Sequence, residues 1–297
     1  MPRTARRPTQ DLPPVFLGRD AVTQGVLTPN QLRGPLVERV LQGVYRPSWT
    51  PLTHVLACQA VALVLPDGAC VTGRSAATMR GVPLARVTDP VEVCAPEALR
   101  MPSRRGVTLR RSKRPIGEVH DVDGVPLANA QRMAFDLAAR HPLARAVGHL
   151  DAVSRAGLVD PAGLAIWLET RHENDVRAVR DAVALVDPRT ESMPESMARV
   201  VLRQAGFDVV PQFVIRARGE FVARVDLALP ELRIAIEYDG AWHALREQLQ
   251  RDRRRIHELR RAGWIIVHVT ADMLANSALL IHAIEDAVRA ATSTIRA

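Results

Sequence analysis

The sequence predicts an α+β multidomain protein, with an N-terminal winged helix-turn-helix, a mostly helical middle and a C-terminal α/β domain. Three observations predict this class. Two short helix signals precede a β-rich pair near Gln42-Gly43, apolar residues recur at helical spacing over 126–187, and two alternating strands follow within 224–243. A chain of 297 residues with 47% hydrophobic content is long enough for two or three small cores.

The N-terminal part is expected to comprise a flexible basic arm (1–13) and a winged helix-turn-helix (14–50). A first helix would run from Arg19 to Gln24 and end at Gly25, a residue that suits the position after a helix. Thr28 would start a second helix, because Pro29 fits the first turn and Gln31 completes a capping box. A hairpin at Gln42-Gly43 would form the wing. The alternative is a small structural helix-hairpin subdomain; in the winged-helix interpretation, Arg33 and Arg46 would contact DNA.

The middle region (51–187) is predicted to be mixed and then helical. Helices are expected at 54–64 and 73–80, and strands at 90–94 and 106–111. The run 104–114 is rich in arginine and would contact phosphates through Arg110, Arg111 and Arg114; the alternative is a solvated edge hairpin. Three or four helices are expected over 126–187, broken at prolines, and 188–194 reads as a linker to the last domain (195–297).

Composition limits the class of protein. The net charge is +8, and residues 1–190 carry 25 Lys+Arg against 18 Asp+Glu, which favours a polyanionic partner, nucleic acid first. Three unpaired cysteines argue against a disulfide framework or a zinc site and are expected to pack in cores. The sequence shows neither a membrane span nor a secretory signal, so a soluble, cytoplasmic protein is expected.

The chemically informative stretch is 224–243. Alternation places Asp226 on one face of the first strand, and Glu237 and Asp239 on the same face of the second. Carboxylates gathered on one sheet face repel one another unless positive charge lies between them. Mg²⁺ prefers oxygen ligands and supplies that charge, so Asp226 and Glu237 are the candidate metal ligands. The alternative is a surface salt-bridge ladder neutralised by Arg224.

Two flanking segments add candidates. Glu195 lies in the first turn of an amphipathic helix, where a carboxylate is also favoured simply by the helix dipole. A later helix, at about 244–262, carries Asp252 on its apolar stripe, where Arg255 would be its partner and both would support the site. Arg251 and Arg254 would clamp a DNA backbone, although a solvated face is the more common role of such a run.

The residues of the C-terminal part resemble the DUF559 family. The resemblance rests on Glu195, the strand from Arg224 to Glu231, Ile236-Glu-Tyr-Asp-Gly240 and His243, and it extends through Asp252, Arg255, Leu259 and Gly263-Trp264 to Asp272. That family is related to the Vsr-like endonucleases of the PD-(D/E)XK superfamily, which implies an α/β restriction-endonuclease-like domain. A shorter resemblance, from Val22 to the ending Gln-Gly-Val-Tyr-Arg, is to the winged-helix N-terminus of AbiEi-type antitoxins.

The resemblance implies a role for each matching residue. Asp226 and Glu237 match metal-binding positions, Glu195 matches the N-terminal helix glutamate, and Asp239 stands where the superfamily usually has lysine. His243 matches a histidine that would act as general base or contact phosphate. The sequence departs from the family at His268, where an arginine is expected.

These observations favour a DNA-binding protein with an Mg²⁺- or Mn²⁺-dependent endonuclease domain that hydrolyses phosphodiester bonds. The second hypothesis is a non-catalytic, antitoxin-like transcriptional regulator that uses the nuclease fold as a scaffold. A third is a nuclease directed at RNA. The sequence leaves open the oligomeric state and any toxin–antitoxin or defence partner.

Overall fold

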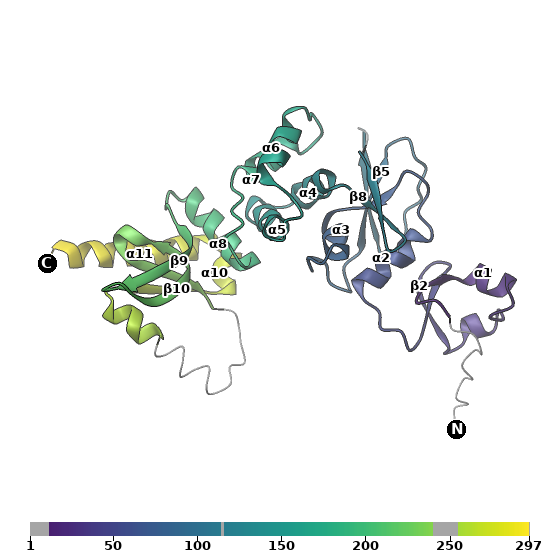
Figure 1. Cartoon of the computed structure of the whole chain (residues 1–297), viewed down its shortest axis with the longest axis horizontal. Coiled ribbons are helices and arrows are strands. Elements are labelled where there is room, and N and C mark those ends of the chain that lie inside the picture. The colour runs from purple at the N-terminus through teal and green to yellow at the C-terminus, as the bar shows by residue number, and fades with distance from the viewer. Residues whose placement is uncertain (1–11, 114–115, 240–254, 297) are drawn as a thin grey trace, which may run out of the picture. The chain divides into compact units, whose positions relative to one another are not determined.

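The computed structural model describes residues 12–113, 116–239 and 255–296. The chain forms two compact units, residues up to 137 with 171–174, and residues 138–170 with 175 onwards. Three β-sheets and the helices around them are divided between these units (Figure 1). The predicted α+β multidomain class is therefore confirmed.

The first unit begins with a small helix-hairpin region. Its elements are β1 (Phe16–Leu17), α1 (Gly18–Thr23), the 3₁₀ turn η1 (Gln31–Arg33), β2 (Val37–Leu41) and β3 (Val44–Pro47), with sheet order β1-β3-β2. The predicted first helix and the hairpin at Gln42-Gly43 are both present. Gly25 and Gly43 both adopt positive φ, which a side chain would disfavour there.

The predicted second helix is reduced to η1. The capping box forms as expected, because the Thr28 amide donates to Gln31 Oε1 (2.8 Å) and the Gln31 amide donates to Thr28 Oγ1 (3.2 Å). Gly34 is then extended, since the residue before a proline is pushed away from the helical region, and Pro35 has no N–H to continue the helix. Between α1 and the hairpin, the fully described segment 24–36 contains no α-helix to serve as a recognition helix.

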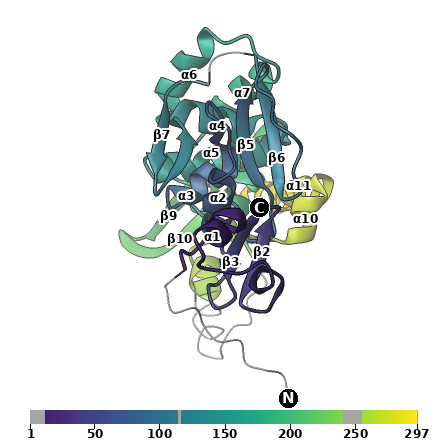
Figure 2. The same ribbon diagram turned by 90° about the vertical axis from the view of Figure 1, so that its right-hand side faces the viewer.

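A five-stranded sheet forms the rest of the first unit. The elements are α2 (His54–Ala62), β4 (Cys70–Val71), α3 (Gly73–Met79), β5 (Val91–Pro96), β6 (Val107–Ser112), β7 (Val119–Val122), β8 (Val125–Ala128) and α4 (Ala130–Ala138). The order is β6-β5-β4-β8-β7, so the basic strand β6 lies at an edge, as Figure 2 shows from the side. The edge position given in the sequence alternative is therefore present, but the hairpin is not, because β6 pairs parallel with β5.

Three cysteines and a buried ion pair lie in the core of this part of the first unit. Cys58, Cys70 and Cys94 are buried and free, as predicted, and burial raises the pKa of each thiol to about 12. The Arg132 guanidinium is buried against Asp136, whose carboxylate also accepts from the Thr72 hydroxyl (2.7 Å).

The second unit begins with α5 (Leu143–Arg155), α6 (Pro161–Glu169) and α7 (Val176–Val183), broken at the predicted prolines. These helices share one compact unit with the C-terminal domain. A buried ion pair links α5 to α8 (Met193–Gln204) of the C-terminal domain. Asp151 Oδ2 of α5 lies 2.9 Å from Arg199 Nη2 of α8. Thr190 is fully buried and donates to the same Oδ2 (2.9 Å), so the expected linker 188–194 is packed against α5.

The C-terminal sheet has the order β12-β11-β10-β9. Its elements are β9 (Val210–Ala217), β10 (Glu220–Leu229), the 3₁₀ turn η2 (Pro230–Leu232), β11 (Ile234–Tyr238) and β12 (Ile265–Val269), followed by α10 (Ala271–Ala275) and α11 (Ser277–Arg296). Neighbours are antiparallel except β11 and β12, which are parallel. α8 and α11 pack against Leu227, Leu229, Ile234 and Ile236, whereas Leu259 of the helical segment 255–261 packs with Ala228 and Ala235.

Within the described residues, no helix has both the length and the apolar character needed to cross a lipid bilayer.

The buried ion pair between α5 and α8 predicts a large stability effect. Asp151→Asn removes the charge that compensates Arg199 and is expected to lower the free energy of unfolding by about 3 kcal/mol, measured by urea titration of the full chain. The control is Asp286→Asn, whose side chain is 58% exposed beside Arg289 and whose loss should cost less than about 0.5 kcal/mol. Equal effects of the two substitutions would contradict the assignment.

Candidate active site

The pairing of β10 with β11 brings the two predicted metal ligands together. The register pairs Leu227 with Ile236 and Ala228 with Ala235. The paired residues end with Leu227 and Ile236, and continuing this register by one residue places Asp226 opposite Glu237. Directly opposed residues of an antiparallel pair have side chains on the same face about 5 Å apart at Cβ. The structure therefore brings Asp226 and Glu237 together more directly than the diagonal relation expected from the sequence.

Asp226 is partly buried at the end of the β10–β11 pair. Its Oδ2 accepts a hydrogen bond from the Tyr238 amide (2.9 Å). Burial raises the pKa of the Asp226 carboxyl above its ordinary value, the amide hydrogen bond opposes that shift, and the negative charge of Glu195 adds to it. Glu195 of α8 and Asp226 of β10 therefore lie close enough for the charge of Glu195 to favour the protonated form of Asp226.

Glu237 is held by an arginine from the following helical segment. Arg255 forms an ion pair with the Glu237 carboxylate and donates to the Arg224 carbonyl (2.7 Å). The Arg224 guanidinium instead pairs with Glu191 (3.0 Å), at a solvent-exposed position. Arg224 therefore does not neutralise the opposed carboxylates, as the salt-bridge alternative required; the cation paired with Glu237 is Arg255.

Glu195 has a defined environment that helix-dipole preference alone does not explain. Its Oε2 accepts from the Glu191 amide (2.9 Å) and from Gln212 Nε2 (2.9 Å). Gln212 lies within β9 with φ of +52°, a left-handed conformation that is strained for a residue with a side chain. Backbone strain of this kind is concentrated at functional sites but also occurs elsewhere in this chain, as at Arg218 and Arg233. Gln212 was not predicted as a site residue, because a single polar residue in an unpredicted strand carries no local signal.

Other predicted site residues lie around this face or outside the described structure. Asp239 is exposed just after β11, and its amide donates to the Val269 carbonyl (2.8 Å). His268 of β12 pairs in register with Glu237 and is also exposed, so the position where an arginine was expected adjoins the carboxylates. The predicted roles of His243, Asp252, Arg251, Arg254 and Arg114 fall on residues outside those that the structure describes.

The opposed carboxylates fit a hard divalent cation. Mg²⁺ is usually held by one or two carboxylates while it keeps several waters, and Asp226 and Glu237 supply that donor set. No group of three His, Cys, Asp or Glu side chains suited to a metal ion occurs among residues 12–113, 116–239 and 255–296. A site built from this pair would therefore leave further coordination positions to water or substrate oxygens.

The predicted DNA-binding arginines of the first unit differ in their contacts. Arg46 pairs with Glu38, Arg110 pairs with Asp136 (2.9 Å), and Arg111 donates to the Met101 carbonyl (3.1 Å). Arg46 and Arg110 are therefore engaged in ion pairs within the first unit, whereas Arg111 is exposed and bonds to backbone carbonyls. Arg33 is exposed, with its Nε donating to the Pro29 carbonyl (3.2 Å).

Comparison with known proteins identifies relatives of unassigned function. No protein-family model matches the chain. The uncharacterized proteins MT2308 and Rv2248, from two strains of Mycobacterium tuberculosis, are each 36% identical to the chain over 106 residues. These alignments cover 35% of this chain and 39% of either relative. The crystal structure of the Rv2827c protein from the same species superposes with a TM-score of 0.40 and 18% identity, over 63% of this chain and 75% of that one.

The raised pKa of Asp226 predicts that the site lowers stability at neutral pH. Because the folded-state pKa lies above the unfolded value, this carboxyl contributes fully to stability only at pH below the ordinary Asp range. The contribution is lost as pH rises through the folded-state pKa. Asp226→Asn, which is neutral at every pH, should therefore unfold at higher temperature than the unsubstituted protein at pH 7 in EDTA.

The gain in unfolding temperature should shrink as pH falls below the ordinary Asp range, because position 226 is then neutral in both proteins. Asp208→Asn is the control, because the Asp208 side chain is 98% exposed. A gain at Asp226 that does not vary with pH would contradict the electrostatic cause.

Proposed function

We propose that this protein is a metal-dependent endonuclease that hydrolyses phosphodiester bonds in DNA. The observation that carries the proposal is the opposition of Asp226 and Glu237 on one sheet face. The resemblance of the C-terminal part to the DUF559 family supports it, because that family is related to Vsr-like nucleases. The net charge of +8 supports a polyanionic substrate.

The two opposed carboxylates would hold the cation, Mg²⁺ or Mn²⁺. Such an ion, when bound, lowers the pKa of a coordinated water and offsets charge that develops on phosphate oxygens. The partial burial of Asp226 suits this role, since a carboxylate that is destabilised by burial and by Glu195 gains most from a nearby positive charge.

Glu195, positioned by Gln212, would take part in proton transfer at the site. The Gln212 amide and the Glu191 amide both donate to Glu195 Oε2, which fixes the orientation of the carboxylate. A fixed carboxylate near the reacting phosphate would orient an attacking water or accept its proton. His243 is proposed for the same task on the resemblance alone.

Loss of either opposed carboxylate should abolish cleavage. Asp226→Asn and Glu237→Gln are each expected to reduce Mg²⁺-dependent nicking of supercoiled plasmid more than about a hundredfold, which exceeds the loss typical of residues that only orient metal ligands. Asp208→Asn should nick at the rate of the unsubstituted protein, and EDTA should stop all cleavage. Nicking that persists in both carboxylate variants would refute the proposed site.

One observation favours a second function, that of a non-catalytic DNA-binding regulator. Glu237 already has a cationic partner in Arg255, so the carboxylate pair is partly neutralised without a metal. A regulator would bind a specific DNA fragment, such as its own promoter, and leave it intact with Mg²⁺, Mn²⁺ or EDTA. Cleavage of that fragment by the unsubstituted protein, but not by Asp226→Asn, would exclude this function.

A further inference from the structure

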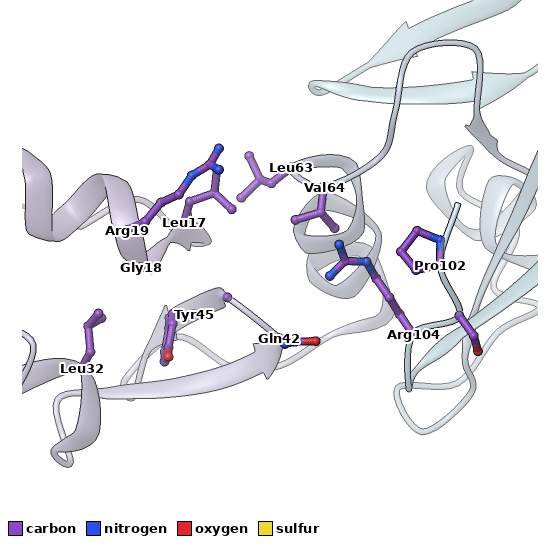
Figure 3. Close-up of a pocket in the computed structure, with 12 residues that line it drawn as sticks. Leu17, Gly18, Arg19, Leu32, Gln42, Tyr45, Leu63, Val64, Pro102 and Arg104 are labelled. Atoms are coloured by element: carbon purple, nitrogen blue, oxygen red, sulfur yellow. The ribbon is translucent and has the colours of Figure 1, made fainter. Parts of the chain in front are cut away.

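Two adjoining cavities lie within the first unit, between the N-terminal hairpin and the loop that precedes β6. The first has a volume of about 580 Å³ and is lined by residues that include Arg19, Tyr45 and Arg104. Figure 3 shows Arg19 and Arg104 on opposite sides of it, with Leu63 and Val64 between them. The second, of about 550 Å³, is lined by Arg39 and Arg105. Because both cavities are also lined by Gln42, Ser103 and Arg104, we treat them as one basic cleft.

The basic cleft gathers positive charge without an acidic lining. Its described lining residues include four arginines and neither Asp nor Glu. Arg19 is paired only with its exposed neighbour Asp20, and among the described residues Arg39, Arg104 and Arg105 have no ion pair. Like charges that converge in this way repel one another unless an anion lies between them.

Four other arginines of this unit, outside the cleft, are neutralised by carboxylates. Arg46, Arg74, Arg110 and Arg132 are all paired with carboxylates of the same unit. The arginines left unpaired around the cleft come from two separate segments, the hairpin strand β2 and the loop before β6. The fold thus brings them together, although they are distant in the sequence.

The chemistry of the lining selects a phosphate-bearing ligand. A guanidinium presents parallel N–H donors that match two oxygens of one phosphate group. The Ser103 hydroxyl and the Gln42 amide add neutral donors of the kind that contact phosphate and sugar in nucleic-acid complexes. The cleft is open to solvent at Arg39 and Arg105, which are both exposed, so a polymer backbone can pass along it.

We propose that the basic cleft binds the phosphodiester backbone of DNA through Arg19, Arg39, Arg104 and Arg105. The choice of DNA as the polyanion rests on the proposed function, whereas the anion site itself rests on the cavities and their charge. Backbone contacts position a duplex without reading its sequence. The cleft therefore confers affinity that is general to DNA and strongly dependent on salt.

The test is fluorescence anisotropy with a labelled DNA duplex, in EDTA, so that cleavage does not contribute. The triple variant Arg39→Gln, Arg104→Gln, Arg105→Gln should bind DNA more than about tenfold more weakly at 0.1 M salt. The magnitude of the slope of log K against log salt concentration should fall by about 2 to 3, because each phosphate contact contributes about 0.9 to it. The matched control removes three exposed arginines that line neither cavity, Arg86, Arg145 and Arg177.

An unchanged salt slope in the cleft variant, or an equal reduction in the control, would overturn the proposal. Tighter binding of an RNA duplex through the same arginines would overturn the assignment to DNA. Circular dichroism checks folding, and the single substitution Arg105→Glu at an exposed position replaces the triple variant if that variant is unfolded. Asp208→Asn, at a position whose side chain is 98% exposed, should bind DNA with unchanged affinity. Because anisotropy is measured without metal, salt-dependent binding through the cleft together with no nicking in Mg²⁺ would refute the nuclease proposal alone.

Discussion

The register between β10 and β11 is the constraint on which the candidate site depends. Leu227, Leu229, Ile234 and Ile236 must all face α8 and α11 to fill that core. Because strand side chains alternate, this requirement sends Asp226 and Glu237 to the opposite face. A slip of one residue would place the Asp226 carboxylate among the apolar side chains, where an unpaired charge is strongly disfavoured. The packing of the core therefore determines the position of the acidic groups, and the site needs no separate device to align them.

The arginines of this chain, which has only one lysine, Lys113, have two different roles. Some form buried ion pairs within the fold, and others are left for a ligand. Arg132 and Arg199 are almost fully buried, and each is matched to an aspartate in its own unit. Buried pairs of this kind add little net stability, but removing either partner leaves an uncompensated charge, so they strongly disfavour alternative packings. Arg39, Arg104 and Arg105 have no such partner among the described residues, and they are therefore available to a ligand. The difference lies in tertiary contacts, since the residue type is the same.

Those contacts also explain which features the sequence could predict. Alternation and turn residues are local, so the two strands that carry Asp226 and Glu237, the hairpin at Gln42-Gly43 and the capping box at Thr28 were all visible in the sequence. Partners far along the chain were not. Arg110 was expected to contact DNA, but its carboxylate partner Asp136 is 26 residues away on α4. The capping box at Thr28 starts a helical turn, but Gly34-Pro35 ends it after η1, so the second helix of the N-terminal region is shorter than its start signal predicts. Gln212 was missed because its meaning depends on its bond to Glu195.

The distribution of charge links the two proposals. Residues 191–297 carry 15 Lys+Arg against 14 Asp+Glu and contain the opposed carboxylates, whereas the excess of positive charge lies in residues 1–190. Arg255 offsets only part of the negative charge of Asp226, Glu237 and Asp239, so this face still disfavours phosphate until a divalent cation neutralises it. Attraction for a polyanion must therefore come largely from elsewhere on the chain, and the basic cleft supplies unpaired guanidinium groups for that purpose. In this division, the carboxylate face keeps the negative charge that binds a divalent cation. The basic cleft provides the affinity for DNA, so the two requirements do not conflict.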